Sequence, residues 1–104
     1  MARRLVVLNV VGLTPALVGP DTPHLAALAR SGAMAPVGPV LPAVTCPVQA
    51  TYLTGLLPRD HGIVGNGWYF RDLAEVMFWR QASPLLGGER LWQAARRRDG
   101  ATPR

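Results

Sequence analysis

Thr45 is the residue whose type and neighbours best suit covalent chemistry. It is followed by Cys46 and Pro47, an arrangement that is typical of the start of a helix. An alcohol at a helix N-terminus is well placed to attack phosphorus, because unpaired backbone N–H groups and the helix dipole both favour an anionic ester there. The hydroxyl needs an activator, usually a metal ion or an adjacent base. On local sequence alone, a helix cap is the more common role of such a threonine.

Other side chains that could do chemistry also have ordinary structural explanations. Asn66 stands in an Asn-Gly pair, which is favoured in tight turns and is equally open to a role in substrate binding. Cys46 lies where a helix start can lower the pKa of a thiol, yet a small buried residue is its more common role. His24 and His61 are expected in a helix and a turn, and we assign them no chemistry. One aromatic group suits either a core or a pocket that stacks a nucleobase: Trp68, Tyr69, Phe70 and Trp79.

The sequence patterns that predict the strands around these residues differ in strength. Residues 5–11 are rich in β-branched side chains and lack strict alternation, which is typical of a strand covered on both faces in a parallel sheet. Residues 34–41 form a weaker extended segment, and the prolines in and beside it indicate an edge or an irregular strand. Residues 68–70 and 76–79, which flank a polar Arg-Asp pair, predict a hairpin.

Three segments predict helices: residues 24–30, 45–56 and 90–98. Asp21 or Thr22 is the expected cap of the first helix, and Thr45 or Cys46 that of the second, which ends at Gly55. Residues 58–62 are typical of a turn. The β-α-β-α order favours an α/β fold with a mostly parallel sheet. We expect residues 1–104 to form part of one domain, the front piece of a longer protein.

The composition indicates a globular chain. It has 104 residues, of which 49% are hydrophobic and 16% are charged, whereas a disordered segment would be more polar. The formal net charge of +5 comes largely from arginines near the two ends. No aromatic residues interleave with those arginines, so nucleic-acid binding through residues 90–98 ranks last among the functions considered.

The sequence also predicts a location and excludes some architectures. The apolar run at residues 5–11 is far shorter than the roughly 20 residues that span a bilayer and is at the lower limit for a signal peptide, so we expect no membrane segment. A single cysteine, Cys46, excludes an intramolecular disulfide and fits a reducing compartment, so we expect a cytoplasmic location. The oligomeric state has no signal in the sequence.

Residues 45–66 carry a long ordered motif that alters the interpretation of Thr45. It comprises Thr-x-Pro at residue 45, Thr-Gly at residue 54, and then Leu-Pro-x-x-His-Gly-Ile-Val-x-Asn ending at Asn66. This motif resembles the nucleophile region of the nucleotide pyrophosphatase/phosphodiesterase (type I phosphodiesterase) family of the alkaline phosphatase superfamily. Residues 22–32 also resemble the first helix of that family, so the likeness covers nearly the whole chain.

The resemblance implies a fold, a reaction and a site. The fold would be the N-terminal portion of an alkaline-phosphatase-like three-layer sandwich with a mostly parallel central sheet. In this family the threonine at the position of Thr45 attacks a phosphodiester and forms a covalent nucleotidyl-enzyme, and the asparagine at Asn66 donates a hydrogen bond to a phosphoryl oxygen. The substrate is a small phosphodiester or nucleotide. Two divalent metal ions, usually zinc, are the cofactors.

The register of the motif argues against the sulfatases of the same superfamily. Those enzymes carry Cys-x-Pro-x-Arg before a similar Thr-Gly, and the cysteine is converted to formylglycine. In this chain Thr45 stands at the position of the modified cysteine and Gln49 at that of the arginine, whereas Cys46 is out of frame.

The metal ligands of the resembling family are missing from this chain. The first of them is an aspartate in a Val-Asp-Gly-like turn that closes the first strand, and Val11 stands in its place. Valine has no donor for zinc, and the amide of Asn9 is a poor substitute for a carboxylate. The remaining family ligands are expected beyond Arg104. We therefore predict no metal ligand in residues 1–104 and no hydrolysis by these residues alone. The alternative is a non-hydrolytic member that binds phosphate or a nucleotide.

Overall fold

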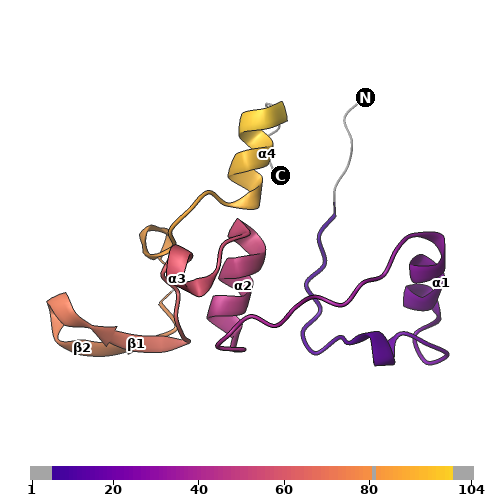
Figure 1. The fold of residues 1–104 in the computed structure, drawn as a ribbon, viewed down its shortest axis with the longest axis horizontal. Helices are drawn as coiled ribbons and strands as arrows, with labels where there is room; N and C mark the ends of the chain where they lie inside the picture. Colours follow the sequence, from indigo (N-terminus) through magenta and orange to yellow (C-terminus); the bar gives the residue numbers. More distant parts are fainter. Residues whose placement is uncertain (1–5, 81, 100–104) are drawn as a thin grey trace. The chain divides into compact units, whose positions relative to one another are not determined.

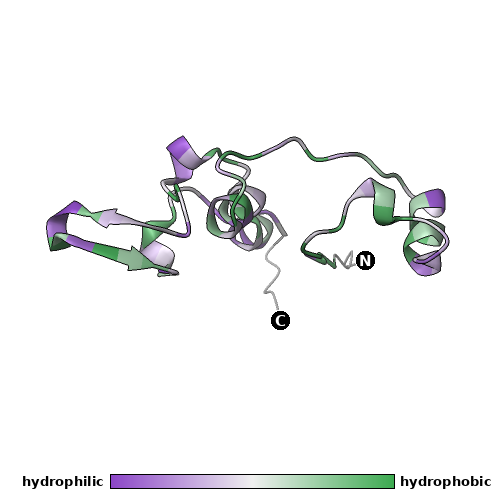
Figure 2. Ribbon diagram, turned by 90° about the horizontal axis from the view of Figure 1, so that it is seen from below, coloured by the Kyte–Doolittle hydropathy of each residue, from purple (hydrophilic) through white to green (hydrophobic). Residues whose placement is uncertain are grey.

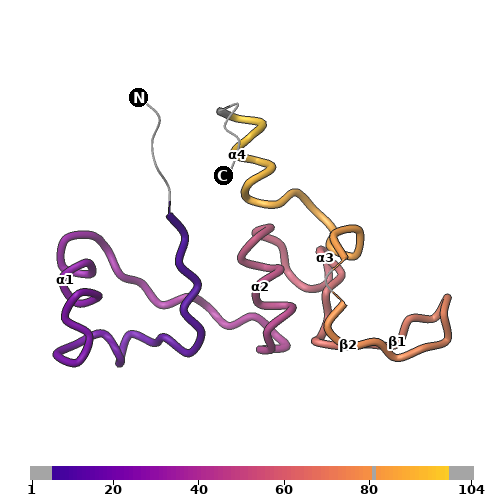
Figure 3. Tube along the Cα trace, turned by 180° about the vertical axis from the view of Figure 1, so that it is seen from behind, coloured from indigo at the N-terminus to yellow at the C-terminus, as the bar shows by residue number. Residues whose placement is uncertain are grey.

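The computed structural model describes residues 6–80 and 82–99, in two compact units that correspond to residues 1–38 and 39–104. We call them the N-terminal unit and the C-terminal unit and describe each by itself. Figure 1 labels the helices and strands, and Figure 3 shows the same chain from behind. In chain order the elements are the 3-10 helix η1 (Pro15–Leu17), α1 (Pro23–Ser31), α2 (Thr45–Thr54), α3 (Pro58–His61), β1 (Gly67–Phe70), η2 (Arg71–Leu73), β2 (Glu75–Phe78), η3 (Ser83–Leu85) and α4 (Leu91–Asp99). No helix in these ranges has both the length and the apolar character needed to cross a membrane.

The N-terminal unit is built around α1, which confirms the helix predicted over residues 24–30. Thr22 occupies the capping position, as expected, and Pro23 starts the helix. The Thr22 hydroxyl does not bind the helix, however. It accepts the Gly19 N–H at 2.9 Å and donates to the Leu17 carbonyl at 2.7 Å. The hydroxyl therefore stabilises the loop that enters the helix.

The strand predicted over residues 5–11 is not formed in the part of it that the structure describes. Residues 6–10 have no regular structure and residues 11–12 form a turn, while Leu5 lies outside the described residues. The valines of this run are exposed, Val6 by 77% and Val11 by 85%. A buried strand needs neighbouring strands to satisfy its N–H and C=O groups. Within the described ranges no segment pairs with residues 6–11, and the weaker strand expected at 34–41 is also absent.

The C-terminal unit holds the buried residues of the described chain. α2 ends where Gly55 adopts the left-handed conformation (φ 71°) and donates its N–H to Thr51 at 2.8 Å, which confirms the predicted end of this helix. α3 packs against α2 and corrects the turn expected over residues 58–62. Pro58 starts this single helical turn and Gly62, also left-handed, stops it. The buried side chains are Val40, Pro47, Ala50, His61 and Ile63.

The hairpin predicted from the aromatic segments is confirmed as β1 and β2. The strands are antiparallel, with Gly67 opposite Phe78 and Phe70 opposite Glu75. Gly67 makes room for the Phe78 ring, because a Cβ at that position would lie 2.4 Å from it and the ring would have to move. The connecting turn η2 is hydrophilic (Figure 2). α4 confirms the last predicted helix.

The fold class is thus confirmed only as a mixture of helices and strands. The sheet of the described residues is the two-stranded antiparallel hairpin. A parallel sheet needs further strands that these residues do not supply, and it stays a prediction.

Candidate functional site

Thr45 is the first residue of α2, and its side chain is exposed. The capping position belongs to Val44, which is extended (φ −124°, ψ 163°), so the expectation that Thr45 or Cys46 caps the helix is wrong. Within the described ranges the Thr45 hydroxyl has no hydrogen-bond partner. It is therefore accessible to a ligand.

The backbone N–H groups at the start of α2 can be accounted for one by one. The first N–H groups of a helix have no partner inside it. The Val44 N–H donates to the Pro42 carbonyl at 2.9 Å, and the Cys46 N–H donates to Asn66 Oδ1 at 2.9 Å. Pro47 has no N–H. Among the described residues, the N–H of Thr45 is left as the donor of this turn that has no partner and is available to an anion.

Asn66 is fastened at two points. Its Oδ1 accepts the Cys46 N–H, and its backbone carbonyl accepts the Trp79 N–H at 2.7 Å. Because Oδ1 is occupied, the side-chain NH₂ remains as a hydrogen-bond donor. The structure therefore brings Asn66 to the first turn of α2, next to the neighbour of Thr45, although Asn66 lies 20 positions after Cys46 in the sequence.

His61 connects three segments of the C-terminal unit. Its side chain is 1% exposed, and its Nδ1 accepts the Ile63 N–H at 3.1 Å. Nε2 must then carry the proton, and it donates to the Thr51 hydroxyl at 3.0 Å. The His61 carbonyl accepts the Gly87 N–H at 2.9 Å. Burial lowers the pKa of this imidazole, and the Pro47 backbone carbonyl and, less strongly, the Asp60 carboxylate oppose the shift only in part. His61 is therefore a neutral structural residue.

A cavity of about 380 Å³ opens beside the start of α2. Its size falls within the range of small-molecule sites. Thr45 and Cys46 line it together with Gln49, Ala50, Leu53, Ile63, Trp79, Arg80, Ala82, Ser83, Leu86, Arg90 and Trp92. Of the aromatic residues considered from sequence, Trp79 lines this cavity, whereas Trp68 and Phe70 stack on each other in the hairpin with ring centroids 5.0 Å apart.

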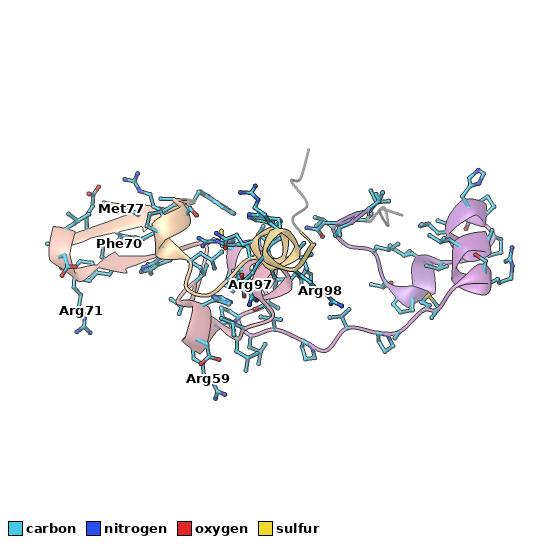
Figure 4. The ribbon with its side chains drawn as sticks, turned by 90° about the horizontal axis from the view of Figure 1, so that it is seen from above. Arg59, Phe70, Arg71, Met77, Arg97 and Arg98 are labelled. Atoms are coloured by element: carbon cyan, nitrogen blue, oxygen red, sulfur yellow. The ribbon has the colours of Figure 1, made fainter. Side chains whose placement is uncertain are left out.

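Arg80 and Arg90 are the residues of this cavity that sequence reasoning missed. Both carry a positive charge, and the lining contains no aspartate or glutamate. Figure 4 labels arginines on other elements, and two of them have carboxylate partners: Arg59 pairs with Asp60 at 3.5 Å and Arg97 with Glu89 at 2.8 Å. No motif connects Arg80 or Arg90 to Thr45 in the sequence, and only the fold brings them to one cavity.

The described residues do not fit the metal site that the family resemblance implies. Val11 is exposed and has no donor atom. In residues 6–80 and 82–99 no group of three or more His, Cys, Asp and Glu side chains could hold a metal ion.

Comparison with known proteins gives one match. The model of the family "Type I phosphodiesterase / nucleotide pyrophosphatase" matches residues 5–103. No curated protein and no solved structure matches the chain. The match covers almost the whole sequence and includes Thr45, Asn66 and the cavity residues between 79 and 92. The chain therefore belongs to the type I phosphodiesterase/nucleotide pyrophosphatase family.

Proposed function

We propose that this chain carries the nucleophile region of a hydrolase that cleaves phosphodiester or nucleotide pyrophosphate bonds. Thr45 is the nucleophile and Asn66 binds a phosphoryl oxygen. The observation that supports this proposal is the hydrogen bond from the Cys46 N–H to Asn66 Oδ1, because it holds the Asn66 amide beside the exposed Thr45. The substrate is a small phosphodiester or nucleotide, and the reaction takes place in the cytoplasm.

The chemistry requires two steps. Thr45 Oγ forms a bond to phosphorus while the bond to the leaving oxygen breaks, and the leaving oxygen keeps the electron pair. The Thr45 proton passes to a base. Water then cleaves the Thr45–phosphorus bond and restores the hydroxyl. The Thr45 N–H and the Asn66 NH₂ are the donors available for the phosphoryl oxygens, whose negative charge grows during attack.

We propose that the group that activates Thr45 comes from outside the described residues, because these contain no candidate metal cluster. Two divalent metal ions, which we expect to be zinc, would supply that activation in the complete family fold. Because the described residues form no such site, we propose that these 104 residues do not hydrolyse substrate alone. The complete protein would have the three-layer sandwich with a mostly parallel central sheet, and residues 1–104 are its N-terminal part.

A non-hydrolytic phosphate- or nucleotide-binding member of the same family is the second candidate. Val11 favours it, since a valine replaces a metal ligand at that position in the family resemblance. Such a protein would keep the Thr45 N–H and Asn66 as anion donors without turnover.

Hydrolysis of a nitrophenyl phosphodiester by the full-length protein, with and without zinc, separates the two candidates. For a hydrolase we expect metal-dependent turnover that Thr45→Ala abolishes and Thr45→Ser retains. Thr14→Ala is the matched control, because Thr14 is exposed and makes no side-chain capping bond. Turnover that persists in Thr45→Ala would refute the assignment of Thr45 as the nucleophile. No turnover in the parent, with retained nucleotide binding, would select the second candidate.

Asn66 can be tested separately from its structural role. Asn66→Asp keeps an oxygen that can accept the Cys46 N–H but removes the NH₂ donor and adds a negative charge. We expect turnover to fall by about 10²–10³-fold, as for loss of an oxyanion donor. Amide exchange at Cys46 should stay slow in this variant. Unchanged turnover would eliminate Asn66 as a phosphoryl ligand.

A further inference from the structure

The cavity beside Thr45 is lined by positively charged side chains that are not needed to bind the phosphoryl group that Thr45 would attack. That group already has the Thr45 N–H and the Asn66 NH₂ as donors. Arg80 and Arg90 line the same cavity, whose lining has no carboxylate. The ion pairs of the described residues involve Arg59 and Arg97 instead. The two cavity guanidinium groups are thus available to a negatively charged ligand.

Arg90 is already oriented by a neighbouring residue. Its Nη2 donates to the Ser83 carbonyl and, at 2.7 Å, to the Ser83 hydroxyl. A guanidinium has five N–H donors in a fixed plane, so those of Nε and Nη1 remain. Since Ser83 holds the plane, an oxyanion that binds the remaining donors costs less side-chain entropy than it would with a free arginine.

Arg80 contributes a second, less restrained cation. Its Nε lies 3.1 Å from Met77 Sδ, and a thioether is only a weak acceptor. Within residues 6–80 and 82–99 neither of its Nη groups has a hydrogen-bond partner. Apolar side chains form another part of the lining, among them Ala50, Leu53 and Ile63. Such surfaces reduce competition from water and strengthen the attraction between the arginines and an anion.

We propose that Arg80 and Arg90 form a second anion site, which binds a negatively charged group of the ligand other than the one that Thr45 attacks. The ligand class is then a small molecule with at least two anionic groups, and inorganic pyrophosphate is the simplest probe. This inference rests on the proposed function only for the identity of the anionic group that lies at Thr45. Binding at the arginines needs neither attack by Thr45 nor a metal ion.

Cys46 supplies a readout that does not depend on activity. It is the only cysteine of the chain, it is half-buried, and it lines the same cavity. A ligand in the cavity should therefore slow its alkylation by the uncharged reagent iodoacetamide. In the 104-residue chain with a metal chelator present, we expect pyrophosphate to protect Cys46 at a concentration about tenfold lower than inorganic phosphate, because charge-assisted hydrogen bonds to the second group add affinity.

Substitutions assign this protection to the arginines. Arg90→Gln should raise the protecting pyrophosphate concentration by about tenfold, and Arg80→Gln by about threefold because Arg80 is more exposed. Arg96→Gln is the matched control: it removes the same charge from an exposed position on α4 that does not line the cavity, and it should have no effect. Arg90→Gln also removes the hydrogen bonds to Ser83 and could disturb the fold. In that case the result for Arg80→Gln decides the test.

The outcomes separate this site from the proposed reaction. Equal protection by phosphate and pyrophosphate, with both arginine variants unchanged, would overturn the second anion site, as would no protection by pyrophosphate. Thr45→Ala should retain pyrophosphate protection, which would support an arginine site independent of attack. Failure of the proposed function would show instead as unchanged turnover of the full-length Thr45→Ala protein, whatever the alkylation result.

Discussion

The two units of this chain differ in how their residues are held. In the described part of the N-terminal unit, residues 6–38, no residue is buried, and side-chain hydrogen bonds join residues at most five positions apart. In the C-terminal unit, side chains join residues 10 and 20 positions apart, through Thr51–His61 and Cys46–Asn66. The candidate site is therefore organised by contacts within the C-terminal unit alone.

The largest expected effect is the loss of stability in His61→Ala, in the C-terminal unit. His24→Ala, in the N-terminal unit, is its comparison. His61→Ala leaves the Ile63 N–H buried without an acceptor and opens a cavity, which should cost about 2–4 kcal/mol of unfolding free energy. His24→Ala removes an exposed side chain on α1 and should cost less than about 0.5 kcal/mol. Amide hydrogen exchange measures both, at Gly55 in the C-terminal unit for His61→Ala and at Gly32 in the N-terminal unit for His24→Ala. Equal losses in the two variants would contradict the difference between the units.

Acidification should weaken the C-terminal unit at the same point. Burial lowers the pKa of His61 in the folded chain, whereas an unfolded histidine titrates at about 6.5. The unfolded state therefore binds more protons once the pH falls below about 6.5, so stability is complete above that pH and is lost as the pH falls toward the lowered folded value.

Amide exchange at Ile63 at about pH 7.5 and about pH 5.5, corrected for the intrinsic rate, gives the measurement. The dependence should disappear in His61→Gln, which cannot titrate in this range. Slower opening at the lower pH would reverse the sign and disprove the assignment of a neutral His61.

Asn66→Ala should have a smaller effect on stability, confined to the first turn of α2. It removes the acceptor of the Cys46 N–H, and loss of a helix cap costs about 1 kcal/mol. The Cys46 amide should exchange faster while the Gly55 amide at the other end of α2 is unchanged. In Asn66→Asp the Cys46 amide should again exchange slowly. Fast exchange in that variant would contradict the conclusion that the side chain of residue 66 caps α2.

The smallest effect is expected at Gly55. Gly55→Ala places a Cβ on a left-handed residue and should cost about 1 kcal/mol or less, although no atom lies within 4 Å of the new Cβ. Gly19→Ala in the N-terminal unit also meets open space and has no positive φ, so its effect should be close to zero. Thermal unfolding followed by circular dichroism compares the two. An equal shift in both would mean that the positive φ of Gly55 does not decide the cost.

Local signals explain what was predictable from the sequence. The end of α2 at Gly55, the start of α1 at Thr22-Pro23 and the hairpin around Arg71-Asp72 each depend on residues next to one another, and all three predictions are confirmed. The predicted cap of α2 failed because its acceptor comes from Asn66, far away in the sequence. The predicted strand at residues 5–11 failed for a related reason, since β-branched residues favour an extended chain but cannot supply the partner strand.

The candidate site was likewise predictable only in part. The motif register selected Thr45 and Asn66, and the fold brings both to the first turn of α2. Their chemical roles remain proposals. Arg80 and Arg90 carried no signal, because an arginine after a strand or before a helix is ordinary on a protein surface. Arg80 and Arg90 line the same cavity because the chain between them turns through η3.

The two-point attachment of Asn66 has a mechanical consequence. One attachment ends on the first turn of α2 and the other on Trp79, at the end of the hairpin. Asn66 thus links the end of the hairpin to the Cys46 amide next to Thr45. A ligand that displaces Trp79 should displace the first turn of α2 as well, so we expect the position of Thr45 to depend on that of the hairpin.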